Sequence, residues 1–181
     1  MNFSNGVNMI ELTQVEVQLT QWVKDVGAGQ ETGIPVPCGE CHACCTKVNA
    51  QLYPNEHKLN FVKRFNKSEN KYHLKHKPNG DCFYLTSVGC SIHDRVAKVC
   101  RTFDCRFMGF FNIRDPKHEH INMASKRWIF INDNDELQQY LYDYFQIGVN
   151  MLPVKAGDPV DRVAKQALLS AYRKFFVDEK P

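Results

Sequence analysis

The stretch Cys38-Gly39-Glu40-Cys41-His42-Ala43-Cys44-Cys45 decides how this chain is expected to fold, because it gathers half of the eight cysteines in one short segment. The spacing of two residues between Cys38 and Cys41 lets two thiolates meet on one metal ion across a tight turn. Gly39 suits such a turn, since glycine adopts backbone conformations that strain other residues. The stretch therefore predicts a metal-binding loop.

The adjacent pair Cys44-Cys45 complicates a site with a single ion. Neighbouring side chains diverge by roughly 100° on a helix and point to opposite faces of a strand. Both thiols can therefore hardly serve the same mononuclear ion. Three interpretations remain open: one of the two is not a ligand, two metal centres lie close together, or a cluster of several metal atoms binds both.

The other four cysteines are too widely spaced for one local loop to gather them around an ion. We therefore expect the two groups to share sites and to close the 36-residue segment between them, residues 46–81. Thiolates select zinc, copper(I) or iron–sulfur chemistry over magnesium or calcium. Arg101 follows Cys100 directly, and its guanidinium is a candidate donor to thiolate sulfur. The candidate metal ligands are Cys38, Cys41, Cys44, Cys45, Cys82, Cys90, Cys100 and Cys105.

Cysteines can also form disulfides, so the compartment matters. Met1 to Asn8 contains no basic residue, and the following segment to Val26 is interrupted by Glu11, Glu16 and other polar residues, unlike a signal peptide. We therefore expect a cytoplasmic protein, in which structural disulfides are rare and clustered cysteines bind metal. No run of 18 apolar residues occurs, so we expect no membrane-spanning segment.

The composition is that of a globular chain. Of the 181 residues, 43% are hydrophobic and 24% are charged, which excludes a disordered or fibrous protein. The length predicts a single domain over residues 1–181, with a cysteine-cluster metal-binding region at 38–105 and a helical C-terminal part at 115–181. The expected fold class is α+β, a mostly helical domain with a small, cysteine-rich, metal-nucleated β-hairpin region.

Local patterns predict the elements of the first half. Apolar residues from Leu12 to Val26 recur at helical spacing, with Gly27 as the expected stop, although the alternation from Val15 to Leu19 also fits a strand. Leu59, Val62 and Phe65 predict a short helix. Residues 82–85 and 90–93 flank Ser87-Val88-Gly89, which predicts a β-hairpin with a cysteine on each arm.

The cysteine-free C-terminal part predicts helices around one short strand. Asp115-Pro116 and Asp158-Pro159 are typical helix starts. Trp128–Ile131 is expected to form a short apolar strand. Asp133 with Glu136 resembles a capping box and predicts a helix that runs to Gly148.

Four blocks of sequence carry the cysteines in order. They are residues 38–45, Asn79-Gly80-Asp81-Cys82-Phe83-Tyr84-Leu85, Gly89-Cys90-Ser91-Ile92-His93-Asp94-Arg95 and Cys100-Arg101-Thr102-Phe103-Asp104-Cys105. Together the blocks resemble the YkgJ-type cysteine-cluster family, whose members are described as zinc- or iron-chelating domains. The resemblance implies metal chelation but no particular reaction. Family members commonly have Tyr in place of His93 and Arg-Pro in place of Arg95-Val96, which makes His93 a candidate additional ligand.

The identity of the metal stays open at this point. Eight cysteines complete two four-cysteine zinc sites with none left over, and such sites are structural. Cys38, Cys41 and Cys44 also match the opening of a bacterial ferredoxin run, but the Cys-Pro that should follow is missing. We therefore favour a zinc or iron ion held by thiolates, with an iron–sulfur cluster in a redox or electron-transfer role as the alternative.

A basic segment separates the two cysteine groups. Residues 47–77 carry seven lysines and one arginine against two glutamates, a local charge of +6 within a chain of net charge +3. Phe61, Phe65 and Tyr72 interleave with these charges, as in some nucleic-acid-binding surfaces. The rest of the chain is acidic, however, so we interpret the segment as solvated surface and do not expect a nucleic-acid partner. No protein partner is indicated.

The sequence does not decide whether the chain is an enzyme. A cysteine nucleophile needs a nearby base, and the chain has several histidines, but no Cys/His/Asn pattern is recognisable. His42 lies between two cysteines, and we interpret it as facing solvent rather than metal. His118 and His120 are two residues apart and diverge on a helix, which favours a surface position. We therefore assign no catalytic residue.

Overall fold

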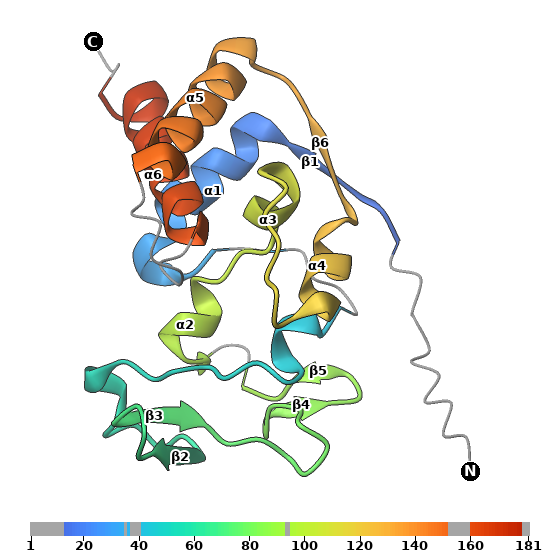
Figure 1. Ribbon diagram of the computed structural model, residues 1–181, viewed down its shortest axis with the longest axis vertical. Coiled ribbons are helices and arrows are strands. Elements are labelled where there is room, and N and C mark those ends of the chain that lie inside the picture. The colour runs from blue at the N-terminus through green and yellow to red at the C-terminus, as the bar shows by residue number, and fades with distance from the viewer. Residues whose placement is uncertain (1–12, 35, 37–40, 93–94, 152–159, 179–181) are drawn as a thin grey trace.

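The computed structural model describes residues 13–34, 36, 41–92, 95–151 and 160–178. It confirms the expected α+β class, with three long helices in one part of the molecule and two small β-hairpins at the opposite end (Figure 1). Short helices connect the two parts. Within the described residues, no helix is long and apolar enough to cross a membrane.

The long helices are α1 (Leu19–Thr32), α5 (Asp135–Met151) and α6 (Val160–Phe176). Trp22, Val23 and Val26 share one buried face of α1, as the helical spacing predicts. Gly27 does not end the helix as expected. A Cβ atom at this position would lie 2.0 Å from Cγ of Tyr172, so the glycine lets α6 approach α1 closely.

Residues before α1 form a strand, so both interpretations of this segment are partly right. β1 (Val15–Gln18) pairs in parallel with β6 (Trp128–Ile131), the strand that the apolar run predicts. Asp133 then accepts hydrogen bonds from both N and Oγ1 of Thr20, at 2.9 Å each. The predicted capping box is therefore wrong: Asp133 binds the start of α1, and Asn134 Oδ1 caps α5 through the Leu137 N–H.

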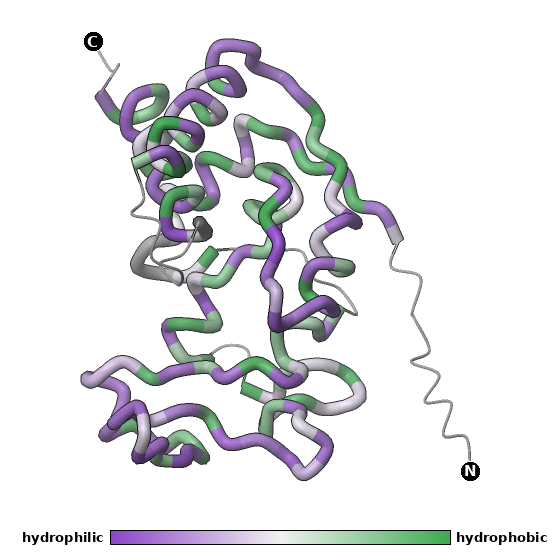
Figure 2. The backbone as a smooth tube through the Cα atoms, viewed as in Figure 1, coloured by the Kyte–Doolittle hydropathy of each residue, from purple (hydrophilic) through white to green (hydrophobic). Residues whose placement is uncertain are grey.

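The opposite end of the molecule contains two antiparallel pairs. β2 (Lys63–Asn66) pairs with β3 (Lys71–Leu74), so the short helix predicted near Phe65 is wrong. β4 (Leu85–Thr86) pairs with β5 (Gly89–Cys90), which confirms a shorter form of the predicted hairpin. Figure 2 shows that the β2–β3 hairpin is mostly hydrophilic.

Within the part of the chain that the structure describes, five short helices lie between these two parts or beside them. They are η1 (Ala43–Cys45), η2 (Pro54–Glu56), α2 (Lys98–Arg101), α3 (Arg106–Phe110) and α4 (Glu119–Ser125). The helix expected from Asp115-Pro116 starts later, at Glu119, because Asp115 Oδ1 accepts the Lys117 N–H in a turn. The predicted start at Asp158-Pro159 lies outside the described residues.

Two hydrophobic clusters of unequal size support the fold. The large one includes Trp22, Phe110 and Leu141 and joins the long helices to α3, α4 and the β1–β6 pair. The small one has only Leu52, Leu74 and Ala97 fully buried at its centre. Cys105 packs against the large cluster and Cys82 against the small one. The cysteine region therefore lies between the two.

Candidate metal centre

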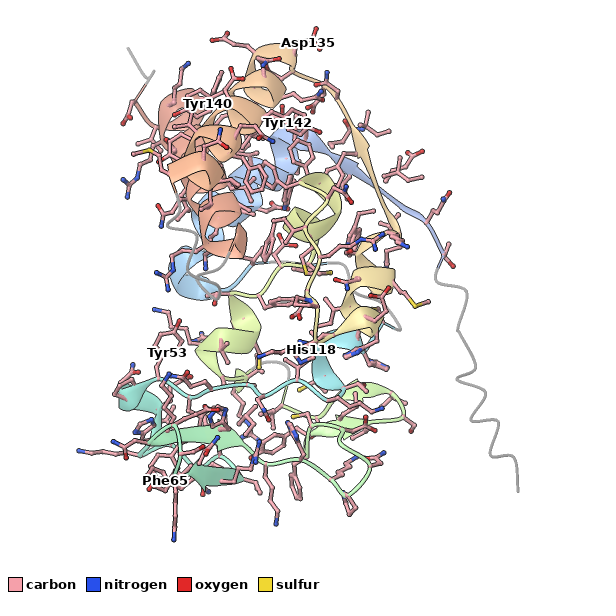
Figure 3. The ribbon with its side chains drawn as sticks, in the orientation of Figure 1. Tyr53, Phe65, His118, Asp135, Tyr140 and Tyr142 are labelled. Carbon is pink, nitrogen blue, oxygen red and sulfur yellow. The ribbon has the colours of Figure 1, made fainter. Side chains whose placement is uncertain are left out.

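All seven described cysteines line one cavity with a volume of about 810 Å³. Several sulfur atoms, drawn in yellow in Figure 3, accordingly lie between the long helices and the hairpins. The seven are thiols rather than disulfides. They are Cys41, Cys44, Cys45, Cys82, Cys90, Cys100 and Cys105. Cys38 and the candidate His93 lie outside the described residues.

Backbone hydrogen bonds bring the two cysteine groups together across the long segment between them. The Cys82 N–H donates to the Cys45 carbonyl at 2.8 Å, and the Lys47 N–H donates to the Gly80 carbonyl at 2.9 Å. Thr46 and Asp81 form an isolated β-bridge beside these bonds. The ends of residues 46–81 are thus brought together by backbone hydrogen bonds, and their closure by a metal ion stays a prediction.

The remaining cysteines come from separate elements. Cys90 ends β5, Cys100 lies on α2, and Cys105 is the N-cap of α3. The side chain of Glu56 joins two of the segments involved: its Oε1 accepts the Lys98 N–H at 2.7 Å and its Oε2 accepts the Tyr53 N–H at 2.9 Å. Glu56 is buried, so these bonds fix the start of α2 from the basic segment.

A second carboxylate, that of Asp104, holds the backbone segment that leads to Cys105. Asp104 is buried, and its Oδ2 accepts the indole N–H of Trp22 at 2.9 Å. Its Oδ1 accepts the Arg106 Nε–H, also at 2.9 Å. The Cys105 sulfur in turn accepts the indole N–H of Trp128 at 3.2 Å. Both tryptophans thus connect the large cluster to this edge of the cavity.

The thiols influence one another's ionisation. Although Cys100 is exposed at the cavity, desolvation by the protein around it raises the pKa of its thiol to about 12, with further contributions from the charges of Cys45, Cys82 and Cys90. A hydrogen bond from Cys44 lowers the pKa of Cys45, although burial and the Asp81 charge oppose it. Burial also raises the pKa of Cys82, again with the charges of Cys45 and Cys90 contributing. These charge effects agree with the position of the thiols around one cavity.

The histidines differ from the expectations. His42 is half-buried and lines the cavity with the cysteines, so whether it faces solvent or a metal stays a prediction. His120 Nε2 hydrogen-bonds the Thr46 carbonyl at 2.7 Å and thereby links α4 to the residue that follows Cys45. His118 Nδ1 pairs with Asp115 at 2.7 Å. His118 and His120 are both partly buried rather than on the open surface.

The donor chemistry of this cavity fits a metal that prefers sulfur. Seven thiols and one imidazole provide soft and borderline ligands, and no Asp or Glu is among the described lining residues. Among the residues that the structure describes, however, no three His, Cys, Asp or Glu side chains converge closely enough to hold an ion. The thiols therefore surround one space without meeting at one point.

Glu56, Asp104 and Trp128 are site residues that sequence reasoning missed. The Glu56 carboxylate accepts a backbone N–H from a residue 42 positions away, and the Asp104 carboxylate accepts an indole N–H from a residue 82 positions away. No local spacing in the sequence reveals such hydrogen bonds. The sequence predicts Trp128 only as part of a short apolar strand. The one available signal was the position of Asp104 directly before a cysteine.

Comparison with known protein families supports the same function. The family model described as "Putative zinc- or iron-chelating domain" matches residues 37–127, which contain all eight cysteines. The chain belongs to this family. Its function is accordingly the binding of a metal ion. No curated protein and no solved structure matches the chain.

Proposed function

We propose that this protein chelates zinc or iron through cysteine thiolates, with the ligands drawn from Cys38, Cys41, Cys44, Cys45, Cys82, Cys90, Cys100 and Cys105. The observation that carries the proposal is the single cavity that all seven described cysteines line. Hydrophobic packing alone does not explain why thiols from five separate segments of the chain line one cavity. A bound cation of two or three charges would offset both the desolvation and the repulsion between thiolates that raise the Cys100 pKa.

An iron–sulfur cluster is the second candidate, and one observation favours it. The thiols surround a wide cavity instead of converging on a point among the described residues. A cluster of several metal atoms presents ligand positions farther apart than a single ion does. The adjacent thiols of Cys44 and Cys45 also suit a cluster or a pair of centres better than one ion.

Elemental analysis with visible absorption on protein purified without air distinguishes the two. Chelated zinc gives a colourless protein with a whole number of zinc ions per chain. An iron–sulfur cluster gives a brown protein that contains acid-labile sulfide and bleaches on reduction. A protein that carries no metal and takes up neither zinc nor iron(II) would overturn the proposal.

Substitution then tests the ligand set. Cys90→Ser is expected to lower the metal content or affinity, since serine is a poor ligand for soft metals. The matched control is Ser91→Ala at the exposed neighbouring position, which should leave metal content unchanged. Cys45→Ala tests the two-centre interpretation: half the metal count supports two centres, and an unchanged count removes that interpretation.

A further inference from the structure

Positive charge is concentrated at the hairpin end of the molecule. The basic segment of residues 47–77 folds there into η2 and the β2–β3 hairpin (Figure 1). Among the described residues, neither of its two glutamates pairs with a lysine or an arginine. Glu56 is buried and accepts backbone N–H groups, and Glu69 Oε2 lies 2.9 Å from His73 Nε2. The cations of the segment therefore have no ion pair within it.

The structure also separates this charge from the acidic part of the chain. The sequence by itself favours a solvated surface, because the rest of the chain is acidic. Residues 133–151 carry four acidic residues and no lysine or arginine. They include α5, whose Asp135 lies at the end of the molecule opposite Phe65 of β2 (Figure 3). The two charges therefore occupy different surfaces, and the hairpin end attracts anions.

Three exposed cations share one face of the β2–β3 hairpin. Arg64 lies directly across from His73, and Lys71 and Lys75 lie two positions before and after His73. Side chains two positions apart on a strand point to the same face. Lys75 continues the pairing, because its N–H donates to the Val62 carbonyl at 2.9 Å. Among the described residues, the side chains of Lys71 and Lys75 have no hydrogen bond or ion pair, so both are available to an anion.

An aromatic ring lies on the other face of the same hairpin. Phe65 follows Arg64, so its side chain points away from the three cations. The ring packs against Tyr72, with centroids 4.9 Å apart, yet Phe65 is still 47% exposed. In the described part of the chain, β2 pairs with β3 alone, so its outer edge is open. A ligand that uses both the cations and the ring must pass around this edge.

We propose that the hairpin end binds single-stranded nucleic acid around the edge of β2, with phosphates on the face of Arg64, Lys71 and Lys75 and a base stacked on Phe65. Exposed aromatic rings beside cations are the usual platform for unpaired bases. A duplex is too stiff to pass around one strand, since its persistence length is about 150 base pairs. An acidic peptide would engage the cations but leave the ring without a partner. The surface contains no candidate metal ligand, so this function is separate from the proposed chelation.

The test uses the full chain as purified without air, so that any bound metal still supports the hairpins. The fluorescence anisotropy of a short labelled oligothymidine should show saturable binding, and a duplex of the same length should bind at least tenfold more weakly. Binding should weaken as salt rises, because phosphate contacts release counterions. An oligouridine titrated in parallel identifies the preferred strand as DNA or RNA.

Two pairs of lysines test the charged face. Lys71→Gln combined with Lys75→Gln should weaken oligothymidine binding at least tenfold. It should also reduce the slope of log affinity against log salt by about 1.4, since each phosphate contact of a single strand contributes about 0.7. Lys24→Gln combined with Lys126→Gln is the matched control. It removes the same charge from two exposed lysines outside the hairpin end and should leave the salt slope unchanged.

Three variants test the ring. Phe65→Ala should weaken binding at least fivefold without changing the salt slope, because the ring contributes stacking and no charge. Phe65→Trp keeps an aromatic ring and should retain binding, which separates lost stacking from a damaged fold. Tyr144→Ala is the matched control, because it removes a partly exposed ring from α5. It should bind as the natural chain does.

Three results would overturn the proposal: no saturable oligothymidine binding at low salt, equal binding by Phe65→Ala, or equal losses in the two lysine pairs. Tighter binding of the duplex, of polyglutamate or of vesicles rich in phosphatidylserine would also overturn it, in favour of another anionic partner. Metal content is measured on the same samples. A chain that carries zinc or iron but binds no oligonucleotide therefore contradicts this inference alone and leaves the proposed chelation standing.

Discussion

At the scale of single residues, the hydrogen bond from Trp128 to the Cys105 sulfur connects the cysteine cavity to the β1–β6 pair. An N–H donor stabilises negative charge on sulfur, and removing such an outer partner typically lowers metal affinity roughly 10- to 100-fold. We therefore expect Trp128→Phe, which keeps an aromatic ring in the core, to weaken metal binding by that factor. Competition with a chromogenic chelator measures the change.

Trp22→Phe is the matched control for that variant. It also removes an indole N–H from the large cluster, but the partner it leaves is the buried Asp104 carboxylate rather than a thiol. A hydrogen bond to a charged group contributes about 1.5–3 kcal/mol. Trp22→Phe should therefore lower the free energy of unfolding in urea by about that amount. If Trp128→Phe changes stability alone and leaves metal affinity intact, its bond to Cys105 has no role in chelation.

The pKa values of Cys45 and Cys100 predict an order of reactivity in the metal-free chain. Only the thiolate reacts with iodoacetamide. The pKa of Cys45 lies below the ordinary value of 9.0, whereas desolvation and neighbouring charges raise that of Cys100 to about 12. At pH 8 Cys45 should therefore be alkylated well before Cys100, and the Cys100 rate should keep rising above pH 10, where the Cys45 rate has levelled off. Peptide mapping by mass spectrometry measures both, and equal rates at pH 8 would contradict the assignment.

The sequence identifies the cysteines as candidate metal ligands, but it does not identify the residues that hold the cysteine-bearing segments in place. Eight cysteines in four blocks indicate metal chemistry whatever their surroundings, because thiolates are soft ligands. The roles of Glu56 and Asp104 arise only when residues 42 or 82 positions apart meet inside the fold. A carboxylate in the sequence is by default a surface residue. Burial, which makes these two important, is a property of the folded chain.

At the scale of elements, α2 is too short to hold Cys100 and Arg101 in place by itself. It has four residues, and its first N–H groups lack partners within the helix. Glu56 supplies one acceptor, to the Lys98 N–H. We expect Glu56→Ala to lower the free energy of unfolding by about 1–3 kcal/mol, because a buried N–H loses its partner. It should also weaken metal binding, since Cys100 is no longer fixed.

Chemical denaturation and metal titration of the same variant check both effects. Glu136→Ala is the control, because Glu136 is an exposed residue of α5 that lies 3.8 Å from Lys174. Surface pairs of this kind contribute about 0–1 kcal/mol, and metal binding should not change. Unaltered stability of Glu56→Ala would show that α2 is held by other contacts.

Helices and strands were predictable from the sequence where a single periodicity dominated. They were not predictable where the local pattern fitted both a helix and a strand and tertiary packing selected one of them. The apolar strand Trp128–Ile131 and the long C-terminal helices follow from local pattern. The helix end predicted at Gly27 is wrong. Glycine often follows the end of a helix, whereas here its missing side chain makes room for Tyr172. Phe65 fits a helix or a strand locally, and its cross-strand contact with Tyr72, with ring centroids 4.9 Å apart, decides for the strand.

At the scale of the whole molecule, the cavity lies between two clusters of very different strength. The large cluster buries side chains from all three long helices, and among the described residues no cysteine is buried in it, although Cys105 packs against its edge. The small cluster has three fully buried residues. Burial of apolar area is the main source of stability, so the hairpin end depends on other interactions. Metal bound between Cys105 on one side and Cys82 on the other would supply them.

This asymmetry predicts a graded response to metal removal. A chelator should leave α1, α5 and α6 folded, because the described buried residues of their core include no cysteine and Cys105 only packs against its edge, but should loosen the hairpins and α2, whose small cluster cannot offset the loss of chain entropy. Hydrogen exchange with mass spectrometry on the loaded and stripped chain measures this directly. Peptides from residues 47–101 should exchange much faster after stripping, and peptides from 135–151 should be unchanged. Uniform acceleration along the whole chain would instead make the metal a condition for folding, as in small zinc domains.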